Sequence, residues 1–158
     1  MSLDTSFFTR QVFRVISDEQ GFTLREEHVD PPIHKSFPLS DLPKDLLQSD
    51  YTLVAEEAGE IRGFASMRFE SWNTRSILRH FYVVPEDRRR GVGTALVGAM
   101  YSLSKKAGGR CLWVETQNIN YPAIQFFIRH GFRFCGLDTS LYDLPSKAIE
   151  EIGLFFAK

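Results

Sequence analysis

A short basic turn that leads into a helix constrains this chain more than any other feature of its sequence. The turn from Arg88 to Thr94 reads Arg-Arg-Arg-Gly-Val-Gly-Thr and follows a strand-like run, Phe81 to Val84. The amide N–H groups of a first helical turn have no intrahelical partner, and together with the helix dipole they favour an anion. The sequence therefore predicts a phosphate-binding turn. The apolar positions that define one buried face of the following helix are Leu96, Met100, Leu103 and Ala107.

Two common phosphate-binding motifs do not fit this turn. A P-loop ends in Gly-Lys-Ser or Gly-Lys-Thr, whereas this chain continues Gly93-Thr94-Ala95. A Rossmann fingerprint would place a third glycine at position 96, which is Leu96, and would follow the first strand of its domain. Two alternatives remain open on the residues alone: another kind of phosphate site, or an ordinary helix start with surface arginines.

Composition limits the other classes of function. The chain has 158 residues, of which 43% are hydrophobic and 25% charged, so we expect one soluble domain over residues 1–158. A net charge of −1 gives no electrostatic reason to expect nucleic acid or an anionic membrane as a partner. Two cysteines form no disulfide framework, and His28 and His34 have no carboxylate at metal-ligand spacing. We therefore expect a cytoplasmic protein without a metal site.

Alternation of apolar residues and turn signals predict a mixed α/β chain. Pro31 and Pro32 indicate a loop, Pro122 the first turn of a helix, and Gly131 the end of that helix. Strands are expected at residues 11–16, 22–28, 51–56, 61–69, 76–84, 111–115, 132–142 and 150–157, and helices at 40–48, 92–107 and 121–130. Within the strand at 61–69 we expect one buried face, formed by Ile61, Gly63, Ala65, Met67 and Phe69.

Two segments resemble a known superfamily. The pattern Val83-x-Pro85-x-x-Arg88-x-x-Gly91-x-Gly93-Thr94 resembles the coenzyme A pyrophosphate loop of the GNAT superfamily of N-acetyltransferases. The segment from Glu115 to Phe132 resembles that superfamily's later strand and helix, in which Asn, Ala, an aromatic pair and Gly-Phe recur at this spacing. The similarity extends from about Phe22 to the C-terminus and is strongest toward streptothricin acetyltransferase-like proteins.

The resemblance implies a fold and an activity. The fold is a mixed α+β domain of GNAT type, with a twisted, mostly antiparallel sheet of about seven strands flanked by helices. The activity is direct transfer of an acetyl group from acetyl-coenzyme A to a primary amine of a small molecule. Alternatives are a protein or peptide N-terminus as acceptor, a longer acyl group, or a coenzyme A-binding module without catalysis. A homodimer is also compatible with the family.

The resemblance also implies a cofactor site. Backbone N–H groups from Arg89 to Thr94 would bind the pyrophosphate, and the main chain of Phe81 and Val83 would pair with the pantetheine arm. Asn120 would hold the pantetheine region, although a simple helix N-cap would look the same in sequence. The cofactor-binding residues implied are Phe81, Tyr82, Val83, Arg88, Arg89, Arg90, Gly91, Val92, Gly93, Thr94, Asn120 and Phe127.

Catalysis needs a base, because an ammonium has no lone pair with which to attack a thioester. Glu115 is the first candidate, since related enzymes have a catalytic Glu at this position, and His80 is the alternative. The superfamily often uses a Tyr as general acid where this chain has Phe127, which cannot donate a proton. Tyr121 and Tyr142 could replace it, or a thiolate of pKa about 8.5 could leave without an acid.

One departure from the family concerns the acceptor. Streptothricin-type sequences carry an acidic pair on the strand before the loop, where this chain has Arg79 and His80. A cation that faced the acceptor would repel a second cation. On the sequence alone, this pair argues against streptothricin as the substrate.

Overall fold

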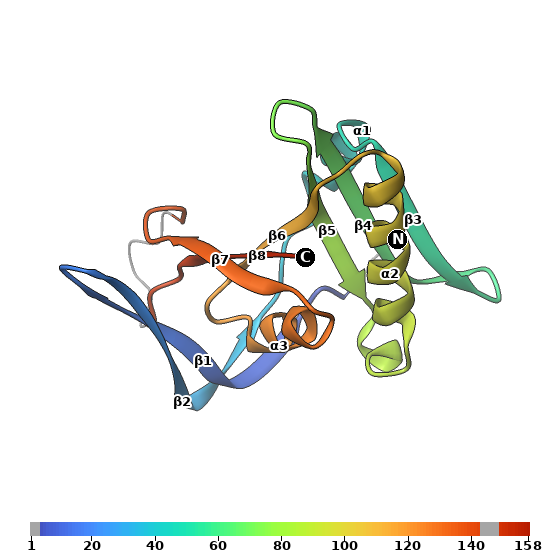
Figure 1. The fold of residues 1–158 in the computed structure, drawn as a ribbon. Helices are drawn as coiled ribbons and strands as arrows, with labels where there is room; N and C mark the ends of the chain where they lie inside the picture. Colours follow the sequence, from blue (N-terminus) through green and yellow to red (C-terminus); the bar gives the residue numbers. More distant parts are fainter. Residues whose placement is uncertain (1–3, 143–148) are drawn as a thin grey trace. The chain divides into compact units, whose positions relative to one another are not determined.

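The computed structural model describes residues 4–142 and 149–158, and the chain forms two compact units (Figure 1). Of the described residues, the first unit contains 4–6, 36–114 and 158. The second unit contains the described residues 7–35, 115–142 and 149–157.

The first unit is a sheet with a helix packed on it. Its strands lie in the order β3-β4-β5-β6, with antiparallel pairing except between β5 and β6, which are parallel. Helix α2 contacts β3, β4 and β5, because burying its apolar face against the sheet removes that face from water. The elements are α1 (Leu42–Leu47), β3 (Tyr51–Glu57), β4 (Glu60–Glu70), β5 (Arg75–Val83), a 3₁₀ turn (Pro85–Asp87), α2 (Val92–Lys106) and the beginning of β6 (Cys111–Gln117).

The core of the first unit differs in detail from the predicted apolar faces. In β4 the consecutive residues Gly63 to Met67 are all buried, so this strand is covered on both faces and not only on the one predicted. In α2 the buried residues are Leu96, Val97, Met100 and Ser104. The prediction was right for Leu96 and Met100, while Leu103 is only half-buried and Ser104 faces the sheet in its place.

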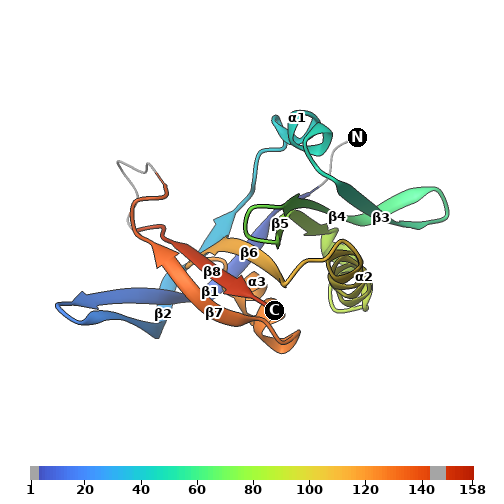
Figure 2. The same ribbon diagram turned by 45° about the horizontal axis from the view of Figure 1, so that its top comes forward.

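The second unit contains a long two-stranded ribbon, β1 (Phe7–Asp18) paired antiparallel with β2 (Gly21–Lys35) (Figure 2). It also holds the end of β6, helix α3 (Tyr121–Arg129) and the antiparallel strands β7 (Arg133–Asp138) and β8 (Gly153–Ala157), in the strand order β6-β8-β7. The ends of α3 follow local rules: Asn120 caps its first turn, and Gly131 follows its last turn at φ +84°.

The predicted loop at Pro31 and Pro32 is wrong, because β2 runs through both prolines to Lys35. The pairing passes directly from Gln11↔His28 to Thr9↔Ile33. Proline has no amide N–H to donate, so a strand can contain it where the ladder is interrupted. The register shift in the ribbon provides that interruption.

The predicted α+β class with mostly antiparallel strands is confirmed, and the described residues form eight strands in two sheets in place of about seven. A single domain over residues 1–158 stays a prediction. Among the described helices, none has the length and apolarity needed to cross a membrane. The described residues also contain no group of three or more His, Cys, Asp or Glu side chains placed to hold a metal ion.

Candidate active site

The turn before α2 has a backbone that suits an anion. Gly91 is the N-cap of this 15-residue helix and lies in the left-handed region at φ +92°, which glycine adopts without strain. Within the described part of the chain, no side-chain hydrogen bond caps the start of this helix. A Cβ at Gly91 would meet no other atom within 4 Å, so the space beside the turn is open. The amides of the first helical turn can therefore serve an external anion.

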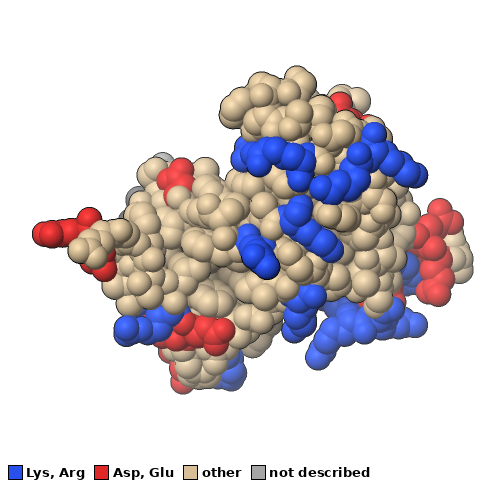
Figure 3. All heavy atoms as spheres, viewed as in Figure 1, with Lys and Arg blue, Asp and Glu red and all other residues tan. Residues whose placement is uncertain are grey.

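The arginines of the turn give it positive charge, and two of them also make contacts that stabilise its backbone. Arg88 Nε donates to the Val83 carbonyl at 3.0 Å, and partial burial lowers the pKa of its guanidinium. Arg90 Nη1 lies 2.6 Å from Oδ1 of the buried Asp87, whose Oδ2 lies 3.6 Å from Arg62 Nε. Arg89 is exposed. Basic side chains gather beneath α2, where Figure 1 places this turn (Figure 3).

Strand β5 extends beyond the residues that pair with β6. The ladder between them runs from Arg75↔Cys111 to Leu78↔Val114 and ends there. On its other side, β5 remains paired with β4 as far as Val83↔Gly63. The last part of β5, which leads into the basic turn, therefore carries Phe81, Tyr82 and Val83 beyond the end of the β5–β6 ladder.

Arg79 and His80 both contact one carboxylate, Asp45 of α1. Arg79 Nη2 lies 3.5 Å from Asp45 Oδ1, and His80 Nε2 lies 3.1 Å from Asp45 Oδ2. A bulge makes this possible: Leu78 pairs with Met67 and His80 with Ser66, which leaves Arg79 as an extra residue in β5. Burial lowers the pKa of His80, and the Asp45 carboxylate opposes this effect.

In the second unit, Glu115 and Tyr142 form a hydrogen-bonded pair. The Tyr142 hydroxyl donates to Glu115 Oε1. Burial raises the pKa of Glu115, and the Tyr142 bond and the nearby Lys35 charge oppose that rise. Burial and the Glu115 carboxylate both raise the pKa of Tyr142 well above the ordinary phenol range. This pair joins two of the three residues predicted as catalytic.

The other predicted residues of the second unit lie around α3. Asn120 Oδ1 accepts from the Ala123 amide at 3.3 Å, so it is a helix cap that uses only its side-chain oxygen. Phe127 is 3% exposed, and its ring packs edge-on against Phe126 and Phe132. Tyr121 stacks on Phe13 and donates to Glu26.

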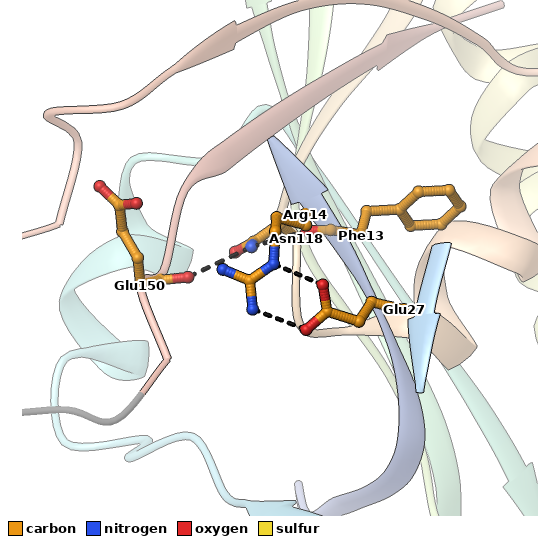
Figure 4. Close-up of polar contacts among 5 residues, drawn as sticks. All are labelled: Phe13, Arg14, Glu27, Asn118 and Glu150. Carbon is orange, nitrogen blue, oxygen red and sulfur yellow. Dashed lines mark hydrogen bonds and ion pairs between the residues drawn. The ribbon is translucent and has the colours of Figure 1, made fainter. Parts of the chain in front are cut away.

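Sequence reasoning did not identify Asn118 as a structural centre. This 3% exposed side chain donates through Nδ2 to the carbonyls of Phe13 (2.9 Å) and Glu150 (3.2 Å). Its Oδ1 accepts from the Ile152 amide at 2.8 Å. The residue thus ties the end of β6 to β1 and to the chain before β8, beside the exposed Arg14–Glu27 pair of the ribbon (Figure 4). Since its partners lie far away in sequence, no local pattern predicts this role.

Comparison with known proteins identifies the family. A profile of the acetyltransferase (GNAT) family matches residues 15–132. A streptothricin acetyltransferase of Streptomyces lavendulae is 38% identical over 147 residues, which cover 89% of this chain and 78% of the relative. The crystal structure of a nourseothricin acetyltransferase matches with a TM-score of 0.86 and 41% identity, covering 99% of this chain and 88% of that one. A Bacillus anthracis protein solved in complex with acetyl coenzyme A shares the fold, with a TM-score of 0.85, 22% identity, and coverage of 100% and 90%. As the sequence predicted, the chain is an N-acetyltransferase and belongs to the acetyltransferase (GNAT) family.

Proposed function

We propose that this protein transfers an acetyl group from acetyl-coenzyme A to a primary amine of a small molecule. The observation that carries the proposal is the turn before α2. Gly91 has a left-handed backbone, no side-chain hydrogen bond from the described residues caps the helix, and three arginines directly precede its start. A pyrophosphate is an anion of the size and charge that such a turn accommodates.

The first unit supplies the proposed binding surface for coenzyme A. Amide groups from Arg89 to Thr94 bind the pyrophosphate, with charge-assisted contacts from Arg88 and its neighbours. The main chain of Phe81 and Val83 pairs with the pantetheine arm like an added strand. The contacts predicted between the cofactor and Asn120 and Phe127 stay predictions; in the second unit Asn120 caps α3 and Phe127 is buried.

Glu115 and Tyr142 carry the proposed proton transfers. An acceptor ammonium first loses a proton, and its nitrogen then forms the N–C bond as the C–S bond breaks. Glu115 takes the nitrogen's proton, and its buried environment makes it a stronger base than an exposed carboxylate. Tyr142 gives its proton to the departing thiolate and recovers one from Glu115 through their hydrogen bond. The products are the amide, the free thiol and one proton released to solvent.

His80 remains the alternative base. Its lowered pKa keeps the imidazole neutral near pH 7, as a base requires. However, its Nε2 is already engaged with Asp45 at 3.1 Å. We therefore place Glu115 first.

A cationic small molecule fits as the acceptor better than the sequence alone suggested. The guanidinium of Arg79 lies against Asp45, so a nearby carboxylate balances its charge. The repulsion expected between Arg79 and a cationic amine is correspondingly reduced. Because two relatives near 40% identity are named for streptothricin and nourseothricin acetylation, we propose amines of that class as the first acceptors to test.

The test of this function is thiol release from acetyl-coenzyme A with a panel of amines. The panel contains streptothricins, lysine, polyamines and peptides with free N-termini. We expect turnover with a small-molecule amine and a loss of at least about a hundredfold in Glu115→Gln. Turnover with peptides alone would overturn the small-molecule proposal, and full activity of Glu115→Gln would assign the base to His80.

Two glycines of α2 give a matched test of the pyrophosphate site. Gly93→Asp places a negative charge in the first turn, where it favours helix stability but repels phosphate. Gly98→Asp adds the same charge to the same helix at an exposed position with space for a side chain. We expect calorimetry to show lost coenzyme A binding in the first variant and retained binding in the second. Equal affinities would contradict the proposed site.

A further inference from the structure

Asp45 of α1 has one side-chain oxygen that is held firmly and one that is held loosely. His80 Nε2 lies 3.1 Å from Asp45 Oδ2 and donates to it, because an ionised carboxylate can only accept. Arg79 Nη2 lies 3.5 Å from Asp45 Oδ1, whereas strong charge-assisted bonds of this kind measure about 2.7 to 2.9 Å. The side chains of Asp45 and Arg79 are 25% and 31% exposed. Asp45 Oδ1 can therefore exchange its present cation for another.

The three side chains of Asp45, Arg79 and His80, which we call the Asp45 cluster, carry one negative and one positive charge near pH 7. Burial lowers the pKa of His80, so its imidazole is neutral at that pH. The Arg79 guanidinium is thus the cation that balances Asp45 within the cluster. An amine is a cation as well when it is protonated, so its ammonium can compete with the guanidinium for the same carboxylate oxygen.

Aromatic rings lie beside the Asp45 cluster. Phe64 of β4 pairs with Tyr82 of β5, and its ring centroid lies 5.3 Å from that of Tyr82 and 6.4 Å from that of His80. Gly63, the neighbour of Phe64 in β4, faces α2, so these rings and α1 lie on the other face of the sheet (Figure 2). Aromatic rings attract ammonium groups, and this face therefore suits a cationic amine.

The proposed course of coenzyme A leads its reactive end toward the same residues. The pyrophosphate would bind at the turn after β5, and the pantetheine arm would pair first with Val83 and then with Phe81. Main-chain groups that face one edge of a strand recur every second residue, so the next position along the arm is Arg79. The thioester is at the far end of this arm. An amine that attacks it would approach β5 at Arg79 and His80.

We propose that Asp45 is a specificity-determining residue for the acceptor: its carboxylate binds an ammonium group of the amine in exchange for the guanidinium of Arg79. The inference rests on the proposed function, because it needs an amine that approaches the end of the pantetheine arm. Arg79 is then the internal counter-ion of Asp45 while no acceptor is bound. Acceptors that carry several ammonium groups gain most from this exchange.

Two substitutions should change acceptor affinity in opposite directions, measured by calorimetry on the coenzyme A complex with spermidine and a streptothricin as probes. Asp45→Asn removes the carboxylate and should weaken binding about tenfold. Arg79→Gln removes the competing cation and should tighten binding by up to about fivefold. Glu70→Gln is the matched control. Glu70 contacts Arg75 at the same distance of 3.5 Å and is 25% exposed like Asp45, and this variant should bind both probes as the wild type does.

The signs of the two changes separate this exchange from a purely structural ion pair. If the contact between Asp45 and Arg79 only held α1 in place, both substitutions would break it and would weaken binding alike, which would overturn the inference. Unchanged affinity in Asp45→Asn would overturn it too. Weaker binding in Arg79→Gln alone would assign Arg79 to an anionic group of the acceptor and would also overturn it.

The His80 imidazole provides a second measurement that needs no turnover. Because this ring contacts the same carboxylate, its NMR signals should shift when a probe is added at about pH 8, where the imidazole is neutral. The signals are assigned by their loss in His80→Gln. The shift should saturate at lower probe concentration in Arg79→Gln and at higher concentration in Asp45→Asn.

These NMR titrations and the thiol-release assay fail independently of each other. Thiol release with a probe that leaves the His80 signals unchanged would overturn the role of Asp45, and the proposed transfer to small molecules would stand. The expected His80 shifts without thiol release from any amine would uphold Asp45 as an ammonium-binding residue and would contradict that transfer.

Discussion

Asn118 allows a quantitative prediction about stability. Replacing it with Ala removes three side-chain hydrogen bonds, to Phe13, Glu150 and Ile152, at a site that is 3% exposed. Each such bond contributes about 1 kcal/mol net, so Asn118→Ala should cost about 3 kcal/mol, and more if water does not reach the backbone groups left behind. For a chain of this size, that loss lowers the melting temperature by roughly 6 to 12 °C.

Two comparisons make the prediction specific to hydrogen bonding. Asn73→Ala removes one bond, from the Arg75 amide to a half-buried side-chain oxygen at 3.1 Å, and should cost about 1 kcal/mol. Asn118→Asp keeps the size and the oxygen that faces Ile152, but it turns a second oxygen toward the carbonyls of Phe13 and Glu150. We therefore expect Asn118→Asp to be at least as destabilising as Asn118→Ala at neutral pH.

Equilibrium unfolding in urea, followed by far-UV circular dichroism, measures these differences in the free energy of unfolding. They are obtained from the shift in the urea midpoint when the dependence on urea concentration is unchanged. The reasoning would be refuted if Asn118→Ala cost no more than Asn73→Ala. It would also be refuted if Asn118→Asp were as stable as the wild type, because volume and not bonding would then explain the site.

Three further outcomes follow from the contacts. Gly63→Ala would place a Cβ 2.7 Å from the Tyr82 carbonyl, so it should cost about 1 to 3 kcal/mol in urea unfolding and weaken coenzyme A binding in calorimetry. Asp45→Asn removes the partner that raises the pKa of His80, so that pKa should fall further in proton NMR titrations. Burial raises the pKa of Glu115, so the folded state keeps a proton that the unfolded chain has released, and stability falls as pH rises through that interval. Glu115→Gln lacks this penalty, and unfolding should show it gaining stability relative to wild type as pH rises above the ordinary glutamate pKa of about 4.3.

The parts of the fold that depend on neighbouring residues were predictable from the sequence. Gly91 and Gly131 mark helix boundaries because glycine adopts the left-handed backbone conformation without strain. The structure places both glycines at helix ends, as expected. Asn120 caps α3 for the same reason. The resemblance to the GNAT superfamily then predicted an activity, because it combined the sequence at the start of α2 with the sequence of the later strand and helix.

The contacts that surround the catalytic candidates were not predictable in this way. The Glu115–Tyr142 hydrogen bond and the contacts of Asn118 join residues far apart in sequence, so only the folded chain brings them together. The shared contact of Arg79 and His80 with Asp45 depends on a bulge set by strand pairing. No local propensity encodes that pairing, and the charge of Arg79 therefore looked unbalanced in the sequence.

The bulge at Arg79 also bears on how this enzyme can diverge. In an ordinary strand, deleting one residue reverses the face of every side chain that follows. Here Arg79 is the extra residue between the Leu78↔Met67 and His80↔Ser66 pairs, so a deletion of one codon would leave His80 and Tyr82 on their present face. A single mutational event could thus remove one cation next to Asp45 without rebuilding the strand. The charge of this region can change over evolution by insertion and deletion as well as by substitution.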